Sequence, residues 1–474
     1  MKRQHASSGI TRRAFLRSAA VTMGALASMP ILAACSPAAP AQPTSAAPAN
    51  TAIAPAATPA PAAAPTSASA PQATAAPAAK AITTLTFTTF WVDQKGWLEP
   101  LIAATEKATS TKFEMDYVEV SSLTAKLKAA LGGGKGPDLF AIQNPSVEDF
   151  AKAGTLLDLT PHLKANGGAW EKTFDPGSFD EFTVDGKIYS VPCNVTVSGL
   201  YYNKALLSKY GLQPPKTLAD MYGWVDKLKA DGIAPYGWGS GDSWYPTQLF
   251  ISTANQTLGP DAYLALNSQG KGSWDSPAIV EAFRTMAEMK AKGLFPQGSE
   301  ALGWQDVKKV FHSEKVATWQ FHQGQIDIFR NEKVLKTASQ NGLEVGVTLI
   351  PALKPEGKGI VQGNNGGAIF INSDSKKAEQ ALEALRFING PEGRKLTAAA
   401  YKIPTGPFSM EGVKLEEPYA TLLKFFIDQS PSKAWLGIRK TKVNVAATSQ
   451  VQAVMVNKAT PEEAAKALAE ADKA

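Results

Sequence analysis

The pattern of hydrophobic and polar residues becomes regular near residue 82. A β-branched and aromatic segment at 85–90 predicts a strand, and apolar residues at helical spacing over 98–108 predict a helix. Alternation over 113–120 predicts a second strand, and the apolar segment 138–142 predicts a third. Strands that alternate with helices indicate an α/β fold with a parallel sheet and right-handed crossovers.

A further helix is expected between the second and third strands. Ser121 or Ser122 is expected to cap its start, and the glycines from Gly132 onward end it. One face carries Leu123, Leu127 and Leu131.

Ligands of parallel sheets bind beyond the carboxyl ends of the strands. In this chain those ends carry polar and aromatic side chains that become candidate ligand contacts. They are Trp91, Asp93 and Gln94 after the first strand and Asn144 after the third.

Length and composition restrict the class of protein. A chain of 474 residues is expected to form two or more lobes. Two cysteines exclude a disulfide-built scaffold, and no Cys/His cluster has zinc spacing, so we expect neither a metal site nor a cofactor. Cys193 is expected to be a small core residue rather than a nucleophile.

The net charge of +6 suggests a polyanionic partner until its location is considered. Residues 1–34 carry five basic residues and no acid, so the rest of the chain is almost neutral. We therefore expect no nucleic-acid partner.

The N-terminal segment has the features of an export signal. Residues 11–17 resemble the twin-arginine motif, and the apolar stretch 19–34 is too short to span a bilayer. Leu32–Cys35 resembles the lipobox of bacterial lipoproteins, so residues 1–34 are expected to be removed and Cys35 to carry the lipid. The Ala/Pro-rich remainder of residues 35–81 is expected to be a disordered linker. These features predict a protein anchored by lipid to the outer face of the cell membrane.

Several segments of the folded part form a recognisable series along the chain. They are 127–142, 153–159, 185–192, 200–204, 211–217, Trp274 with Pro277, 311–317 and 368–404. In this order they resemble the extracellular solute-binding proteins of bacterial ABC importers, and the likeness is greatest to family 1, in the carbohydrate group that includes maltose-binding protein.

The resemblance implies a two-lobed, periplasmic-binding-protein-like fold of the Venus flytrap type, with strands that cross a hinge. Lobe 1 is expected to comprise 82–193 plus 367–405, and lobe 2 to comprise 196–364 plus 406–474. Glycines near the crossings fit either a hinge or ordinary turns. They are Gly199, Gly363, Gly366 and Gly367.

A sugar needs hydrogen-bonding groups for its hydroxyls and flat aromatic rings for its apolar faces. The segment 238–245 supplies both, and its Trp238, Asp242 and Trp244 are candidate contacts. The resemblance implies that a similar position of the family provides an acid and a stacking aromatic ring. A surface loop with Trp244 packed into the core is the alternative.

The strand expected around Ala317 offers a second group of candidates. Alternation places Trp319 and Phe321 on one side and Gln320 and His322 on the other. Trp319 or Gln323 is the expected ligand contact, with core packing as the alternative for Trp319.

The remaining candidates depend on the resemblance. Trp435 occupies a region where the family carries a cleft-lining tryptophan, and Asn364 lies near a crossing, where it either contacts ligand or forms a turn. Packing is the better explanation for four further tryptophans in or beside helical patterns. These are Trp97, Trp170, Trp224 and Trp304.

The function expected from the resemblance is that of an extracytoplasmic binding protein. It binds a sugar or oligosaccharide between its lobes and delivers it to separate ABC permease subunits, and the family's usual state is a monomer. Alternatives are a non-sugar solute such as a polyol phosphate, a polyamine or iron, or a secreted carbohydrate-active enzyme. Serine-hydrolase, zinc-protease and phosphate-loop motifs do not occur, so we expect no enzyme.

Overall fold

The computed structural model describes residues 81–142, 146–175, 177–242, 244–331, 343–429 and 437–474. All of these lie in one unit, Pro77–Ala474. The expected signal, Cys35 and linker fall outside the described residues, as do Asn144 and Trp435. Within those ranges no helix has the length and hydropathy needed to cross a membrane.

A five-stranded sheet organises the N-terminal part of the fold, with strand order β2-β1-β3-β12-β6. β1 pairs in parallel with both β2 and β3, which confirms the predicted parallel arrangement, whereas β12 pairs antiparallel with β3 and β6. The strands are β1 (Thr83–Thr89), β2 (Thr111–Tyr117), β3 (Leu139–Ile142), β6 (Ser190–Pro192) and β12 (Ala368–Ile371).

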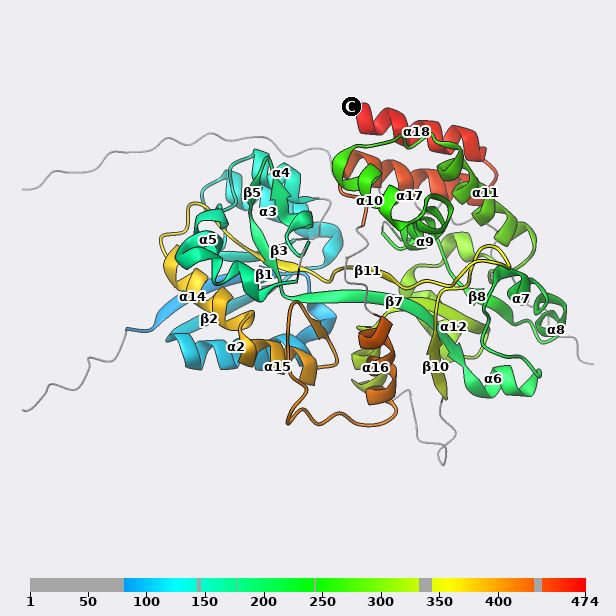
Figure 1. The fold of residues 1–474 in the computed structure, drawn as a ribbon, viewed down its shortest axis with the longest axis horizontal. Helices are drawn as coiled ribbons and strands as arrows, with labels where there is room; N and C mark the ends of the chain where they lie inside the picture. The colour runs from blue at the N-terminus through cyan, green and yellow to red at the C-terminus, as the bar shows by residue number, and fades with distance from the viewer. Residues whose placement is uncertain (1–80, 143–145, 176, 243, 332–342, 430–436) are drawn as a thin grey trace, which may run out of the picture. The chain divides into compact units, whose positions relative to one another are not determined.

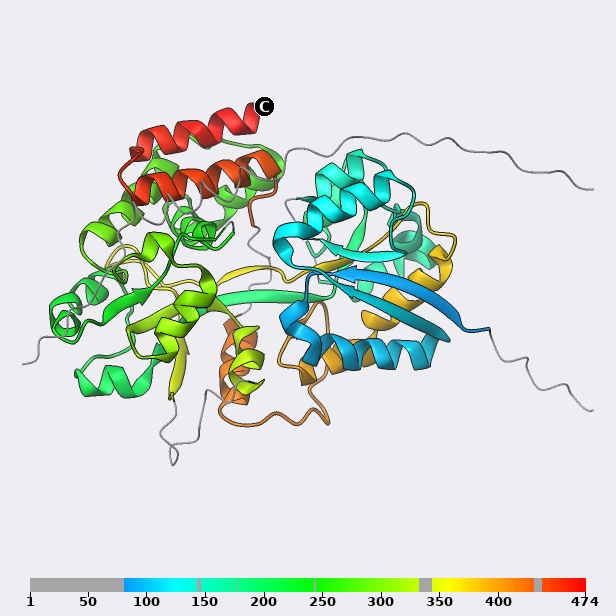
Figure 2. The same cartoon turned by 180° about the vertical axis from the view of Figure 1, so that it is seen from behind.

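Helices cover both faces of this first sheet (Figure 1). On one face α2, α14 and α15 bury a core that includes Trp97 and Leu385, and on the other α3 and α4 bury Leu127 and Phe150. Figure 2 shows α2, in blue, beneath the blue strands β1 and β2. The helices are α2 (Lys95–Thr109), α3 (Val120–Gly132), α4 (Val147–Lys152), α5 (Thr160–Gly168), α14 (Ala378–Ile388) and α15 (Pro391–Ala399). Between α5 and β6 lie short elements, η3 (Glu171–Thr173), η4 (Asp180–Phe182), β4 (Thr183–Val184) and β5 (Lys187–Ile188).

The start of α3 differs from the sequence prediction. The N-cap residue is Glu119, and Ser121 and Ser122 lie inside the first turn. The Ser122 hydroxyl donates to the Glu119 carbonyl at 3.1 Å instead of accepting from a free backbone N–H. A serine hydroxyl can either accept from a backbone N–H or donate to a backbone carbonyl. Its presence therefore locates the start of a helix only to within one turn.

A second sheet has the strand order β10-β7-β9-β8, with β11 and β13 also paired to β7. β7 is antiparallel to all four of its partners, and β8 is parallel to β9. The strands are β7 (Asn194–Asn203), β8 (Ala234–Gly237), β9 (Val316–His322), β10 (Val345–Thr348), β11 (Gln362–Asn365) and β13 (Ile403–Pro404).

Helices pack against this sheet through a large apolar core that includes Tyr201, Phe250, Phe311 and Phe426. The earlier helices are α6 (Lys204–Lys209), α7 (Leu218–Tyr222), α8 (Val225–Lys229), α9 (Pro246–Leu258), α10 (Pro260–Gln269), α11 (Pro277–Ala291) and η5 (Ser299–Ala301). The later ones are α12 (Trp304–His312), α13 (Gln325–Asn331), α16 (Tyr419–Gln429), α17 (Thr441–Met455) and α18 (Pro461–Lys473).

The chain passes between the two sheets at closely spaced points. β6 of the first sheet is followed at once by β7 of the second, and β11 of the second is followed by β12 of the first. β13 then pairs with the beginning of β7, at Val195 and Asn194. The first residues of β7 therefore lie where three chain passages meet.

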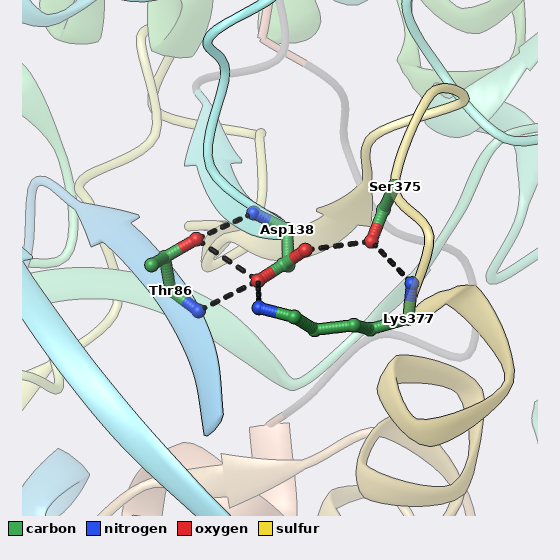
Figure 3. A network of polar contacts seen from close by, with 4 residues as sticks. All are labelled: Thr86, Asp138, Ser375 and Lys377. Atoms are coloured by element: carbon green, nitrogen blue, oxygen red, sulfur yellow. Dashed lines mark hydrogen bonds and ion pairs between the residues drawn. The ribbon is translucent and has the colours of Figure 1, made fainter. Parts of the chain in front are cut away.

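A buried carboxylate ties the first sheet together (Figure 3). Asp138 accepts hydrogen bonds from the Thr86 backbone and hydroxyl, at 2.9 and 3.0 Å, and from Ser375 at 2.7 Å. Lys377 Nζ lies 3.2 Å from the same carboxylate. Asp138 precedes β3, whereas Trp91 and Gln94 follow the parallel strand β1. The network and these two residues therefore lie at opposite ends of the strands.

Candidate ligand-binding site

One face of β7 presents polar side chains where the chain passages meet. Asn194, Thr196 and Ser198 alternate along the strand, whereas Val195 and Val197 face the core of the second sheet. β11 places Gln362 opposite Ser198 and Asn364 opposite Thr196, although the Asn364 side chain is outside the description.

Lys402 joins residues from both sheets at this place. Its side chain is buried, with 3% of the residue exposed, and its ammonium donates to Gln94 Oε1 at 2.8 Å. The predicted ligand contact Gln94 therefore lies beside β13. Asp93, its neighbour in the short helix η1 (Val92–Gln94), is exposed.

His322 ends β9 and faces Ser198 across the strand pair. Burial, and then the positive charge of Lys402, lower the pKa of His322 to about 3. The ring is therefore neutral at neutral pH. Its Nδ1 accepts from the Gly324 backbone at 3.1 Å, which leaves Nε2 as the protonated donor.

The expected alternation in β9 is present, with different consequences for each side. Trp319 and Phe321 stack at 4.5 Å between ring centroids. On the other side Gln320 donates to Ser252 at 2.7 Å and accepts from the Tyr236 hydroxyl. The Gln320 amide is therefore occupied within the protein.

A group of aromatic rings adjoins the end of β9. Trp244 is half-buried. Its ring centroid lies 6.4 Å from that of Trp304 and 6.2 Å from that of Phe321. Trp304 stacks on Phe321 with 5.4 Å between the ring centroids. The partial exposure of Trp244 and Trp304 leaves ring surface available to an apolar sugar face. Trp304 was expected only to pack, because no sequence pattern links the start of α12 to residue 244.

Asp242 positions this aromatic group. Its carboxylate accepts a hydrogen bond from the Trp304 backbone N–H at the first turn of α12. A β-carbon at Gly303 would lie 2.6 Å from Asp242 Oδ1, so a larger residue at 303 would require the Asp242 carboxylate to move. The acid that sequence analysis assigned to ligand contact thus holds Trp304 beside Trp244.

Three predicted indoles lie in the cores. Trp91, Trp238 and Trp319 are 0%, 2% and 0% exposed. Trp319 Nε1 donates to the Tyr245 hydroxyl at 2.9 Å, and Trp238 packs on Phe295. Trp238 and Trp319 are therefore accounted for by packing, because both indoles fill the core of the second sheet.

Gln323 is fully engaged with β7. Its Oε1 accepts from the Val197 N–H at 2.6 Å, and its Nε2 donates to the Val195 carbonyl at 2.7 Å. The amide therefore acts as an extra pair of backbone groups that holds the strand, and both of its atoms are taken by the protein rather than left for a ligand.

Some of the buried polar groups that lack a partner among the described residues lie at or near the chain passages, and others, such as Trp238 Nε1 and the Tyr263 hydroxyl, lie elsewhere. Those near the passages are Trp91 Nε1 after β1, Asn194 Nδ2 at the start of β7, Thr405 Oγ1 after β13 and both amide atoms of Gln325 at the start of α13. Such groups are normally hydrogen-bonded in folded proteins. Both donors and acceptors are available here, which suits a hydroxyl-rich molecule.

Two further features concern metal ligands and the Cys193 thiol. Among the residues that the structure describes, no group of three or more His, Cys, Asp or Glu could hold a metal ion. Burial raises the pKa of the Cys193 thiol to about 12, so it is protonated at neutral pH and suits a core position.

Comparison with known proteins identifies the family. Residues 91–395 match the family described as "Bacterial extracellular solute-binding protein". The chain belongs to this family. As a bacterial extracellular solute-binding protein, it has the mixed α/β, two-lobed fold of its relatives, with each sheet covered by helices.

Three similar proteins carry names of sugar-binding function. A "Probable sugar-binding periplasmic protein" of Mesorhizobium japonicum is 34% identical over 172 residues, which cover 36% of this chain and 40% of that relative. A "Multiple sugar-binding protein" of Streptococcus mutans is 25% identical over 69% of this chain and 75% of its own length. A solved structure named "Chitin oligosaccharide binding protein" superimposes with a TM-score of 0.68 at 26% identity, covering 83% of this solute-binding protein and 98% of that chain.

Proposed function

We propose that this protein binds a sugar or oligosaccharide outside the cytoplasm and delivers it to the permease of an ABC importer. The observation that carries the proposal is the group of half-buried rings, Trp244 and Trp304, beside Phe321 at the end of β9, a strand that pairs with β7. Unpartnered polar groups at the first residues of β7 add to it. Rings stack on the apolar faces of sugars, and unpartnered amide and hydroxyl groups bond their hydroxyls. The names of the similar proteins support the same ligand class.

The proposed contacts differ from those of the sequence analysis by two additions and three removals. Trp304 is added because it lies beside Trp244, and Asn194 because its amide nitrogen has no partner among the described residues. Trp238 and Trp319 are assigned to core packing and Gln323 to holding β7. The proposed set is Trp91, Asp93, Gln94, Asn144, Asn194, Asp242, Trp244, Trp304, Asn364 and Trp435.

The proposed mechanism is closure of two lobes on the sugar. Lobe 1 is taken as 82–193 plus 367–405 and lobe 2 as 196–364 plus 406–474, with the passages around β7 as the hinge. A sugar that contacts both lobes stabilises the closed form only by its higher affinity for that form. The permease is then proposed to recognise the closed form.

The proposed cellular setting follows from the N-terminal sequence. Residues 1–34 are taken as a twin-arginine signal, Cys35 as the lipid-bearing residue and the linker up to residue 81 as a spacer. The protein would act as a lipid-anchored monomer without catalytic activity.

A thermal-shift screen tests the ligand class. A ligand that binds only the native protein raises the melting temperature. We expect N,N′-diacetylchitobiose, maltotriose or raffinose to raise it, and spermidine and sn-glycerol-3-phosphate to leave it unchanged. A response to a charged solute alone would contradict the sugar assignment, and release of monosaccharides during incubation would contradict the absence of catalysis.

Trp244 provides the mutational test of the site. Trp244→Ala is expected to weaken binding of the responding sugar at least tenfold, about 1.4 kcal/mol, because it removes a stacking surface. Isothermal titration calorimetry measures the effect. Trp170→Ala is the matched control, since Trp170 packs on Phe174 next to the first sheet, away from β9. Equal affinity of wild type and Trp244→Ala would remove Trp244 from the site.

A further inference from the structure

We propose that the Trp91 indole N–H and the Asn194 amide NH₂ form a donor pair that selects ligands with an acceptor oxygen between them. The inference rests on the proposed function and adds a specificity rule to it. Neither group has a hydrogen-bond partner among the residues that the structure describes.

Trp91 is completely buried, yet its N–H has no partner in the part of the chain that the structure describes. Two other buried indoles satisfy this group, since Trp97 Nε1 donates to Thr397 at 3.3 Å and Trp319 Nε1 donates to Tyr245. The N–H groups of Trp170 and Trp238 also lack a partner, but neither indole lies beside the chain passages at the start of β7. Trp97 packs against Trp91 itself, at 5.0 Å between ring centroids. The same core therefore contains a satisfied indole beside an unsatisfied one.

Asn194 is 3% exposed, and its Nδ2 has no partner. A buried amide without a partner loses the free energy of its bonds to water. Asparagine at the first position of β7 is therefore unfavourable for the free protein unless another molecule completes its hydrogen bonds.

Two consecutive glycines lie against the side chains of Trp91 and Asn194. A β-carbon at Gly367 would lie 2.5 Å from the Trp91 ring and 3.2 Å from its Nε1. A β-carbon at the preceding residue, Gly366, would collide with Asn194 Oδ1 and Thr196 Oγ1. The indole and the amide therefore lie against adjacent residues of one backbone segment, between β11 and β12.

The unpartnered atoms, Trp91 Nε1 and Asn194 Nδ2, are hydrogen-bond donors only. A ligand group that pairs with them must therefore be a hydrogen-bond acceptor. An ether, hydroxyl or acetamido oxygen accepts such bonds, whereas an ammonium group has no lone pair to offer. Sites that hydrogen-bond a ligand group reject analogues that lack it, because their buried groups then stay unpaired. The pair thus favours neutral oxygenated solutes over polyamines.

Nuclear magnetic resonance of the ¹⁵N-labelled indoles tests the pair directly in the whole protein. The Trp91 and Trp97 signals are assigned with Trp91→Phe and Trp97→Phe. Without sugar, the Trp91 N–H signal is expected at the upfield position of an unbonded indole and the Trp97 signal downfield. A downfield Trp91 signal in the free protein would overturn the inference, whether or not any sugar binds.

Addition of N,N′-diacetylchitobiose, maltotriose and raffinose completes the test. A sugar that raises the melting temperature is expected to move the Trp91 signal downfield and leave that of Trp97 in place. An unmoved Trp91 signal with a bound sugar would overturn the inference alone. No binding of any of these sugars would count against the proposed function, and the free-protein spectrum would still decide whether the donor is unpaired.

Asn194→Asp provides the matched mutational test, because it replaces the donor with an acceptor of the same shape. We expect it to weaken binding of the responding sugar at least tenfold, whereas Asn389→Asp leaves affinity within about twofold. Asn389 is also buried, but its Nδ2 donates to the Leu385 carbonyl within α14 and its following turn. Unchanged affinity of Asn194→Asp would overturn the inference.

Discussion

Replacement of Asp138 by asparagine is expected to lower the free energy of unfolding by about 2–3 kcal/mol. The carboxylate accepts from Thr86 and Ser375 and pairs with Lys377, and its side chain is only 11% exposed (Figure 3). An amide keeps the shape but loses the charge and turns one acceptor into a donor. Urea unfolding at pH 7 measures the loss.

The same substitution predicts a pH dependence. Burial acts to raise the pKa of Asp138, but hydrogen bonds from Thr86, Ser375 and Lys377 outweigh it and hold the pKa below the ordinary value. A carboxyl whose pKa is lowered by folding stabilises the protein above its unfolded pKa of about 3.9. The advantage of wild type over Asp138→Asn should therefore be full at pH 7 and disappear as the pH falls through the folded pKa.

Asp428→Asn is the control for this experiment. Asp428 pairs with Lys424 on an exposed helix surface, and such pairs contribute about 0.3–0.5 kcal/mol. A loss from Asp138→Asn no larger than that of Asp428→Asn, or one independent of pH, would show that the network does not stabilise the fold.

Gly367→Ala is expected to destabilise the protein by about 2–4 kcal/mol. Gly367 has φ of +134°, a conformation that side-chain-bearing residues rarely adopt, and its β-carbon would meet the Trp91 ring at 2.5 Å. Both the backbone and the core would have to shift. Thermal unfolding measures the loss, and weaker sugar binding should accompany it because Trp91 moves.

Gly132→Ala separates this effect from that of adding a methyl group anywhere. Gly132 ends α3, and no atom lies within 4 Å of the position of its β-carbon. We expect it to be neutral or slightly stabilising. Equal stability of Gly367→Ala and Gly132→Ala would contradict the proposed contact between Gly367 and Trp91.

The periodicity of apolar residues was sufficient to predict those strands and helices that depend on local sequence. The strands at 85–90 and 138–142 and the helix at 98–108 were predicted because their apolar residues repeat at the spacing of each element. The cap of α3 was not, because a serine hydroxyl can bond the helix in more than one way.

The candidate site was only partly predictable from residue types. Trp244 follows from an aromatic residue in a Gly/Ser-rich loop, and Gln94 from its position after a strand. Trp304 was missed because Asp242 brings it there through one hydrogen bond across 62 residues of chain. Gln323 was expected at the ligand because nothing local reveals that its amide holds β7.

The sequence by itself determined the family and the α/β character, since these depend on local patterns and on their order along the chain. Tertiary structure decided which polar groups are hydrogen-bonded within the protein and which have no partner among the described residues. Trp91 and Trp97 are both buried indoles. The Trp97 N–H donates to Thr397, whereas the Trp91 N–H has no acceptor among the described residues and is therefore the candidate donor. Hydrogen-bond satisfaction depends on distances between remote residues, which no local pattern encodes.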